Sequence, residues 1–176
     1  MRPSLNHLAN LLMSLLPPTR LFAVKRLLWR TCGAEVGARV SVNLGARIFG
    51  GGHVVVGADT WIGIGCRLIV PHGSTIRLGA RCDVAPGVMF ECGSHRVGSS
   101  SRRAGKGYSS SISVGEGTWV GARALILGGA ELGPGSIVAA GAVVLAGTYP
   151  PNALLAGVPA KTVRILDHPD DCGASE

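Results

Sequence analysis

The segment 114–149, VGEGTW-VGARAL-ILGGAE-LGPGSI-VAAGAV-VLAGTY, falls into six blocks of six residues. The first position of each block is a large aliphatic residue: Val114, Val120, Ile126, Leu132, Val138 and Val144. The fifth position is always small: Thr118, Ala124, Ala130, Ser136, Ala142 and Thr148. A helix would repeat its apolar residues about every 3.6 positions, and a simple strand at every second position. A period of six with two size classes instead predicts a parallel β-helix, in which three blocks close one triangular coil.

The same register continues upstream with interruptions. Further blocks begin at Val36, Val42, Ile48, Val56, Ile62, Leu68, Leu78, Val84 and Phe90. We therefore predict about five coils over residues 36–165, with Leu154–Pro159 opening a last partial turn. Residues 49–55 and 71–77 do not fit the register and are interpreted as bulged corners. The predicted fold class is mainly β, a β-helix domain over 35–165 with a short N-terminal helical segment.

The composition agrees with this fold and excludes several others. Among 176 residues there are 27 glycines and only 8 aromatic residues, so the core must consist of small aliphatic side chains. A hydrophobic fraction of 47% excludes intrinsic disorder, and the glycines lack the period of three that collagen requires. The five cysteines are odd in number and form no C-x-x-C pair, which favours reduced thiols in a cytoplasmic protein.

Three segments lie outside the repeat. Residues 1–34 have helical apolar spacing and five cations without an acid. We favour a cap on the end of the β-helix, because solenoids need capped ends, and keep contact with the inner membrane surface as the alternative. Residues 96–113 form a basic, polar excursion that we expect to be a flexible, functional loop. Residues 166–176 are an acidic tail.

One histidine has a predictable direction. In the block that starts at Phe90, the fifth residue should point inward, so the sixth, His95, should point outward at a corner. It also lies at the base of the 96–113 excursion. A lone surface histidine usually has no function, but this position makes His95 the candidate for acid–base chemistry.

From about Cys82 to Arg164 the chain resembles the hexapeptide-repeat acyltransferases, in the group of maltose, galactoside and Nod-factor acetyltransferases and their relatives in polysaccharide biosynthesis. The resemblance lies in DVAPGVMFECGSH (83–95), RRAGKGY (102–108), the blocks of 114–144 and YPPNALLAGVPAKTVR (149–164). It implies a left-handed β-helix, a homotrimer with active sites between subunits, and acetyl-CoA as co-substrate without a metal.

The resemblance assigns His95 as the general base that takes a proton from an acceptor hydroxyl. Transfer would be direct, in keeping with the lack of a Ser-His-Asp or Cys-His arrangement near His95. The partner that orients His95 stays open. Glu91 is four residues of strand away, about 13 Å, so a backbone carbonyl or a neighbouring subunit is favoured.

The donor-binding positions that the resemblance implies are Trp119, Ala122, Ala140, Leu145, Ala146, Lys161 and Arg164. Lys161 and Arg164 would contact the phosphates of CoA, and Trp119 could equally be a trimer contact. Galactoside-type members have a lysine where this chain has Ala146. They also carry an acceptor-binding asparagine that IGIGCRL (62–68) lacks. Candidate acceptor contacts are Glu91, Arg102, Arg103 and Tyr108, with Glu91 as a solvated surface charge as the alternative.

The sequence thus predicts a cytoplasmic acetyl-CoA-dependent O-acetyltransferase acting on a sugar, glycan precursor or related hydroxylated metabolite. The alternatives are an N-acyltransferase on an amino sugar and a non-catalytic solenoid scaffold. A γ-class carbonic anhydrase needs two zinc-binding histidines five residues apart, which positions 7, 53, 72, 95 and 168 do not provide. A serine acetyltransferase would need a larger helical domain, and nucleic-acid binding would need aromatics interleaved with the basic residues. We expect His53 and His72 to be ordinary corner residues.

Overall fold

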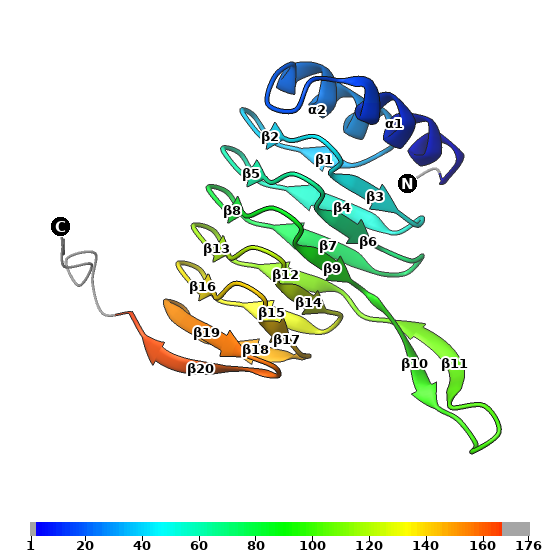
Figure 1. Cartoon of the computed structure of the whole chain (residues 1–176), viewed down its shortest axis with the longest axis vertical. Helices are drawn as coiled ribbons and strands as arrows, with labels where there is room; N and C mark the ends of the chain where they lie inside the picture. Colours follow the sequence, from blue (N-terminus) through cyan, green and yellow to red (C-terminus); the bar gives the residue numbers. More distant parts are fainter. Residues whose placement is uncertain (1–2, 167–176) are drawn as a thin grey trace.

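The computed structural model describes residues 3–166, so the predicted acidic tail beyond Leu166 lies outside the described residues. Two helices, α1 (Pro3–Leu15) and α2 (Phe22–Thr31), are followed by a stack of short strands (Figure 1). The strands form three sheets that wind around a common core, together with a separate two-stranded hairpin. The prediction of a mainly β solenoid with a helical N-terminal segment is confirmed.

The order of strands within each sheet shows the winding. The first sheet runs β1 (Glu35–Val36), β4 (His53–Val56), β7 (Thr75–Leu78), β12 (Ile112–Val114), β15 (Ala130–Leu132) and β18 (Gly147–Tyr149). The second runs β2 (Ser41–Val42), β5 (Trp61–Ile62), β8 (Asp83–Val84), β13 (Trp119–Val120), β16 (Ile137–Val138), β19 (Ala153–Gly157) and β20 (Ala160–Ile165). The third runs β3 (Arg47–Phe49), β6 (Arg67–Ile69), β9 (Met89–Glu91), β14 (Leu125–Leu127) and β17 (Val143–Val144).

Each coil contributes one strand to each sheet, and the paired strands of successive coils are parallel. Five coils are complete, and β18 and β19 begin a sixth, whose chain turns back as β20 in antiparallel pairing. The sixth coil therefore begins earlier than the partial turn predicted at Leu154–Pro159. The first positions of the predicted blocks from Val36 to Val144 are buried, which confirms the inward direction of these residues, whereas in the last partial turn Leu155 is buried in place of the predicted Leu154.

Two of the small fifth positions do not point inward as predicted. Ser94 is exposed because the chain leaves the coil there. Thr148 is exposed because Tyr149, and not Pro150, pairs with Leu132 in the first sheet. A shift of one residue turns each side chain to the opposite face of a sheet, so the last block breaks the six-residue rule.

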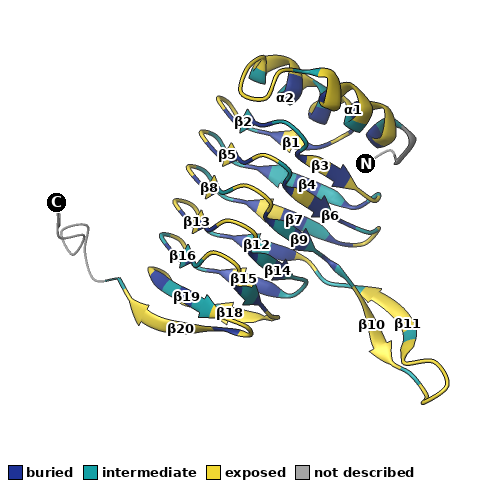
Figure 2. Cartoon of the chain, viewed as in Figure 1, coloured by how far each residue is buried: buried dark blue, intermediate teal, exposed yellow. Residues whose placement is uncertain are grey.

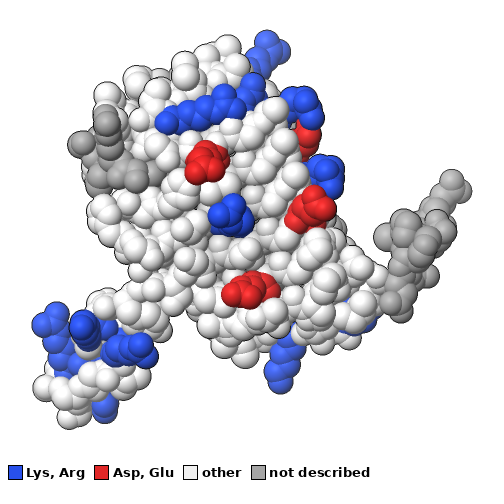
Figure 3. Space-filling model, turned by 180° about the vertical axis from the view of Figure 1, so that it is seen from behind, with Lys and Arg blue, Asp and Glu red and all other residues white. Residues whose placement is uncertain are grey.

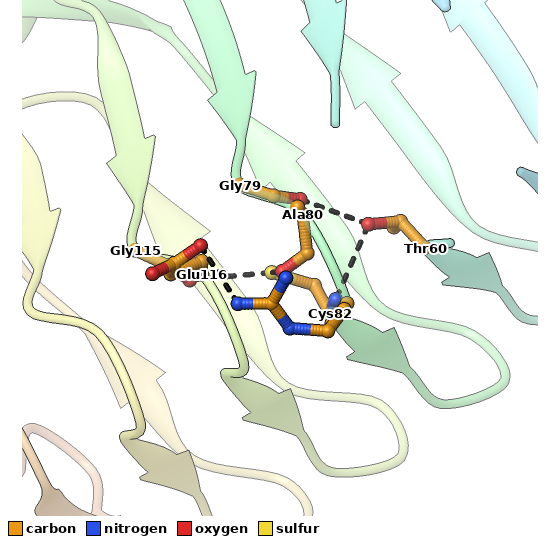
Figure 4. A network of polar contacts seen from close by, with 7 residues as sticks. Thr60, Gly79, Ala80, Cys82, Gly115 and Glu116 are labelled. Atoms are coloured by element: carbon orange, nitrogen blue, oxygen red, sulfur yellow. Dashed lines mark hydrogen bonds and ion pairs between the residues drawn. The ribbon is translucent and has the colours of Figure 1, made fainter. Parts of the chain in front are cut away.

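Figure 4 shows why the fifth positions must be small where the first sheet passes into the second. The Thr60 hydroxyl donates to the Gly79 carbonyl at 2.8 Å and accepts from the Cys82 amide at 3.2 Å. The Cys82 thiol in turn lies 3.2 Å from the Gly115 carbonyl of the next coil. These short side chains therefore pair with backbone groups of the following coil and fill a corner with no room for a longer residue.

All three interruptions of the register occur at the corner between the third and first sheets. Residues 50–52 and 70–74 are the short ones, narrower than the predicted 49–55 and 71–77. The third carries the antiparallel hairpin of β10 (Gly93–Val97) and β11 (Ala104–Ser109), which projects from the body (Figure 1). The prediction of a flexible loop over 96–113 is therefore wrong. Strand pairing orders most of the excursion, and Ile112 is already buried in the next coil.

The two helices lie across the N-terminal end of the β-helix (Figure 1), where α1 contacts β3 and α2 contacts β1 and β2. The first coil has no preceding coil, so its carbonyls that point toward the N-terminal end of the stack lack a strand partner. Side chains of the helices supply the donors: Asn6 to Gly50, Asn10 to Ile48, Arg26 to Val40 and Arg30 to Val36. Met13 of α1 and Trp29 of α2 belong to the same hydrophobic core and extend it from the first coil into the helices.

Candidate active site

A surface pocket of about 770 Å³ lies where the hairpin leaves the third coil. Its walls come from the base of both hairpin strands, from Glu91 at the end of β9, and from the neighbouring corner at Pro71 and His72. Three of the predicted site residues, Glu91, His95 and Tyr108, line it together. The pocket also contains His72, which the sequence analysis treated as an ordinary corner residue.

His95 is exposed on β10, and its ring lies over the backbone of the opposite strand. Its Nδ1 is 2.9 Å from the carbonyl oxygen of Gly105. A carbonyl oxygen can only accept, so in the neutral ring Nδ1 carries the hydrogen and Nε2 keeps a lone pair. The orienting partner is thus a backbone carbonyl, the kind of group that the sequence analysis favoured, and it comes from the other strand of the same hairpin.

Glu91 has a different task from orienting the histidine. Its side chain is half-buried, and its carboxylate accepts a hydrogen bond of 2.8 Å from the amide of Gly93. This bond holds the chain where it turns out of the coil into β10. Glu91 is therefore a structural acceptor in the pocket wall rather than a freely solvated charge, which was the alternative at the sequence level.

The hairpin is strongly basic. Its exposed cations are Arg96, Arg102, Arg103 and Lys106, and no acidic residue occurs between Cys92 and Gly115 (Figure 3). Arg96 stacks on the ring of Tyr108, with its guanidinium carbon 4.8 Å from the ring centre. Arg102 and Arg103 lie at the tip of the hairpin and do not line the pocket. The structure thus brings Tyr108 to the pocket but separates these two arginines from it.

The residues implied for donor binding lie at other corners of the same coils. Ala122 and Ala140 are at successive turns between the second and third sheets, where the Gly141 amide donates to the Ala122 carbonyl at 2.8 Å. Trp119 is exposed on β13, directly before the first of these turns. None of these three residues lines the pocket of His95.

The remaining donor-binding candidates form two further groups. Leu145 and Ala146 are exposed at the corner between the third and first sheets, in a later coil than the hairpin. Lys161 and Arg164 are exposed on β20, opposite Ala156 and Leu154 of β19. Two exposed cations and a series of small corner residues are suited to a phosphate-bearing, extended ligand.

Thiol chemistry is suppressed in the described part of the chain. All four cysteines between residues 3 and 166 are buried and free. Burial raises the pKa of Cys92, next to Glu91, to about 11, and raises that of Cys66 to about 11 as well. These thiols remain protonated near neutral pH and are poor nucleophiles.

His72 is the residue of the pocket that sequence reasoning missed. It belongs to the short corner insertion before β7, and its carbonyl accepts from the Ser109 hydroxyl at 3.3 Å. The useful signal was that this insertion and the hairpin occur at the same corner of successive coils. His53, by contrast, pairs with Glu35 at 2.9 Å, and no group of three candidate metal ligands occurs among residues 3–166.

Comparison with known proteins agrees with this geometry. Residues 111–146 match the family model of the bacterial transferase hexapeptide, six repeats. Galactoside O-acetyltransferase of Escherichia coli is 28% identical over 120 residues, which are 68% of this chain and 58% of that protein. The chain spans about half the length of the curated relatives it matches.

Two solved structures show the same fold. A hexapeptide-repeat acetyltransferase from Vibrio cholerae, in complex with acetyl coenzyme A, has a TM-score of 0.81 and 25% identity, covering 94% of this chain and 87% of that one. A maltose O-acetyltransferase from Clostridium difficile has a TM-score of 0.67 at 18% identity, covering 95% and 87%. Residues 111–146 thus carry the hexapeptide repeat of bacterial transferases, within a chain folded as a parallel β-helix with a basic hairpin at its candidate site.

Proposed function

We propose that this protein is an acetyl-CoA-dependent O-acetyltransferase that acts on a hydroxyl of a sugar, glycan precursor or related metabolite. The observation that carries the proposal is the state of His95: Nδ1 is held by the Gly105 carbonyl, which leaves the lone pair on Nε2, and the residue lines a pocket large enough for a sugar. The likeness to acetyltransferases, one of them bound to acetyl coenzyme A, supplies the donor.

The proposed reaction is a direct transfer. The acceptor hydroxyl gives its proton to Nε2 of His95 as its oxygen attacks the thioester carbonyl carbon of the donor. The carbon–sulfur bond then breaks, and the CoA thiolate recovers the proton to leave as thiol. The raised pKa of Cys92, about 11, makes an acyl-cysteine intermediate at the pocket unfavourable.

The spread of the donor-binding candidates supports a homotrimer. Ala122 and Ala140 lie at a different corner from the hairpin, whereas Leu145 and Ala146 share the hairpin corner. One groove can contain both sets only if neighbouring copies bring different corners together. We therefore propose that each active site combines His95 of one subunit with Trp119 and the small corner residues of the next. We place this reaction in the cytoplasm, in the modification of polysaccharide precursors.

The pocket residues differ in their proposed roles. Glu91 keeps the base of the hairpin in position through Gly93, and Tyr108 forms the wall that Arg96 supports from behind. His72 faces the same pocket from the neighbouring corner, so we propose that it contacts the acceptor. Lys161 and Arg164 are proposed to bind the phosphates at the nucleotide end of the donor.

The test is replacement of His95 by alanine, with release of CoA thiol measured across a panel of sugars and amino sugars. Loss of the base should reduce turnover on the order of 10²–10⁴-fold, while binding of CoA measured by calorimetry persists. His53→Ala is the matched control, because it also removes a histidine near a corner, but one that pairs with Glu35 and does not line the pocket.

Three outcomes would contradict the proposal. Near-normal turnover of the His95→Ala variant would remove the base assignment. Thiol release only with amino sugars would replace O-acylation by N-acylation. A wild-type protein that neither binds CoA nor releases thiol with any acceptor would favour the non-catalytic scaffold.

A further inference from the structure

The two N-terminal helices differ from ordinary surface helices, which bury their apolar stripe, because each exposes a row of aliphatic side chains and turns polar side chains toward the β-helix. On α1, Asn6, Ala9 and Met13 face the β-helix and are buried. Leu8, Leu11, Leu12 and Leu15 occupy the opposite side and are between 40% and 76% exposed. Their spacing of three and four residues places them in one stripe along the helix.

Helix α2 repeats this arrangement. Lys25 is fully buried, and its ammonium group donates to the carbonyls of Pro17 and Pro18 at 2.7 and 2.9 Å. Val24 and Leu27 are exposed on the side away from the coil, and Leu21, directly before the helix, is exposed as well. Figure 2 shows the exposed outer surface of both helices. We call the seven exposed side chains the leucine face: Leu8, Leu11, Leu12, Leu15, Leu21, Val24 and Leu27.

The inward polar groups pair with carbonyls of the first coil or, in the case of Lys25, of the connection between the helices, but no contact among the described residues 3–166 explains the leucine face. Clustered exposed aliphatic side chains are rare on monomeric proteins and mark sites of contact with a partner or a membrane. Both helices lie across the end of the β-helix (Figure 1), so the face is broad and directed along its axis. Such a shape fits a planar surface.

The charges around the leucine face distinguish between two partners, a second copy of this chain and an anionic membrane. Residues 1–34 contain no Asp or Glu, and Arg20 is exposed in the connection between the helices. A second copy placed face to face would bring Arg20 toward its own equivalent with no acidic residue of 1–34 to offset it. An anionic lipid surface instead attracts this cation while its acyl region accepts the leucines.

We infer that the leucine face inserts into the interface of an anionic membrane, with the β-helix standing away from the bilayer. No helix among residues 3–166 has the length and apolarity to cross a bilayer, so the contact is peripheral. This arrangement leaves the pocket of His95 free, because it lies on a later coil than the helices. The inference rests on the helices alone and does not depend on the proposed reaction.

The test uses the full chain and sedimentation with vesicles of phosphatidylcholine, with and without phosphatidylglycerol. The wild type should bind the anionic vesicles and lose affinity with added salt. The triple variant Leu11→Gln, Leu15→Gln, Leu27→Gln should bind at least on the order of 10²-fold more weakly, because three leucines that the membrane would bury are lost. The matched control is Leu→Met at the same three positions, which keeps the apolar area and should retain binding.

Glutamine and methionine are both good helix formers, and these positions face away from the core, so circular dichroism melting should be unchanged in both variants. Equal vesicle binding by the glutamine variant and the wild type would overturn the inference. So would a wild type that ignores the vesicles but forms concentration-dependent assemblies that the glutamine variant abolishes, since the face would then join two copies.

Discussion

The coils and the helices of this protein differ in the polar side chains that they bury. In the coils, apolar residues such as Phe90 and Ile126 are fully buried, while cations and carboxylates stay outside. In the helices, Asn6, which donates to the Gly50 carbonyl of the first coil, is buried and Leu15 is 76% exposed. The difference follows from what each region must cover. A coil interior is lined by apolar side chains, whereas the end of a stack presents backbone carbonyls that need donors.

The same contrast appears in the ion pairs. Along the corner between the first and second sheets, Arg39 binds Asp59 through two bonds of 2.6 and 2.7 Å, and Arg81 binds Glu116 at 2.9 Å, all at exposed positions (Figure 3). The cations of α2 instead reach inward to carbonyls. The ion pairs of the coils therefore lie where water screens them, whereas the Lys25 ammonium group of α2 is buried.

The largest predicted effect on the free energy of unfolding comes from comparing a buried apolar residue of the coils, Phe90, with an exposed one of the helices, Leu15. Phe90→Ala removes a fully buried ring from the third coil and should lower the free energy of unfolding by about 3–5 kcal/mol. Leu15→Ala removes an exposed side chain of comparable apolarity and should change it by only about 0.5 kcal/mol. Urea denaturation of both variants tests the contrast. A large loss for Leu15→Ala would mean that the leucine face is packed in solution, by self-association for example.

The next effect concerns the inward cations. Arg26→Met keeps much of the side-chain volume but leaves the Val40 carbonyl, bonded at 2.8 Å in the wild type, without its donor. We expect a loss of about 1–3 kcal/mol in the free energy of unfolding. Arg20→Met, at an exposed position, is the matched control and should change little. Equal stability of the two variants would show that the end carbonyls do not need side-chain donors.

The smallest effect belongs to the exposed ion pair. The Arg39 guanidinium, bonded to the Asp59 carboxylate, lowers the pKa of Asp59, and the charge of Arg81 adds to this. A lowered folded-state pKa stabilises above the unfolded pKa, and this contribution disappears as the pH falls through the folded value. Thermal unfolding of Asp59→Asn should therefore differ slightly from the wild type at neutral pH and converge with it in acid. A difference that grows in acid would contradict the sign.

The sequence predicted the coil more completely than the site. The six-residue register correctly placed the inward residues of the complete coils apart from Ser94, because each block is a local unit that repeats. The register failed at Thr148, because Tyr149 pairs with Leu132 although three blocks of six would place Pro150 there. No local pattern in the sequence marks this shift of one residue. The sequence analysis also predicted a flexible loop where β10 and β11 pair, because the polar, glycine-rich composition of 96–113 lacks the alternation of apolar residues that would indicate a hairpin.

The sequence by itself determined that the chain winds into a β-helix, since this follows from a period that each strand carries locally. The exposure of His95 does not follow from that period, because Ser94 before it is exposed as well and both residues lie on β10, outside the coil. Only the tertiary structure decided that Gly105 orients His95, that His72 faces the same pocket, and that the leucines of α1 point outward. These outcomes depend on groups far apart in the repeat: the two strands of a hairpin, the corners of successive coils, and the unpaired carbonyls at the end of the stack.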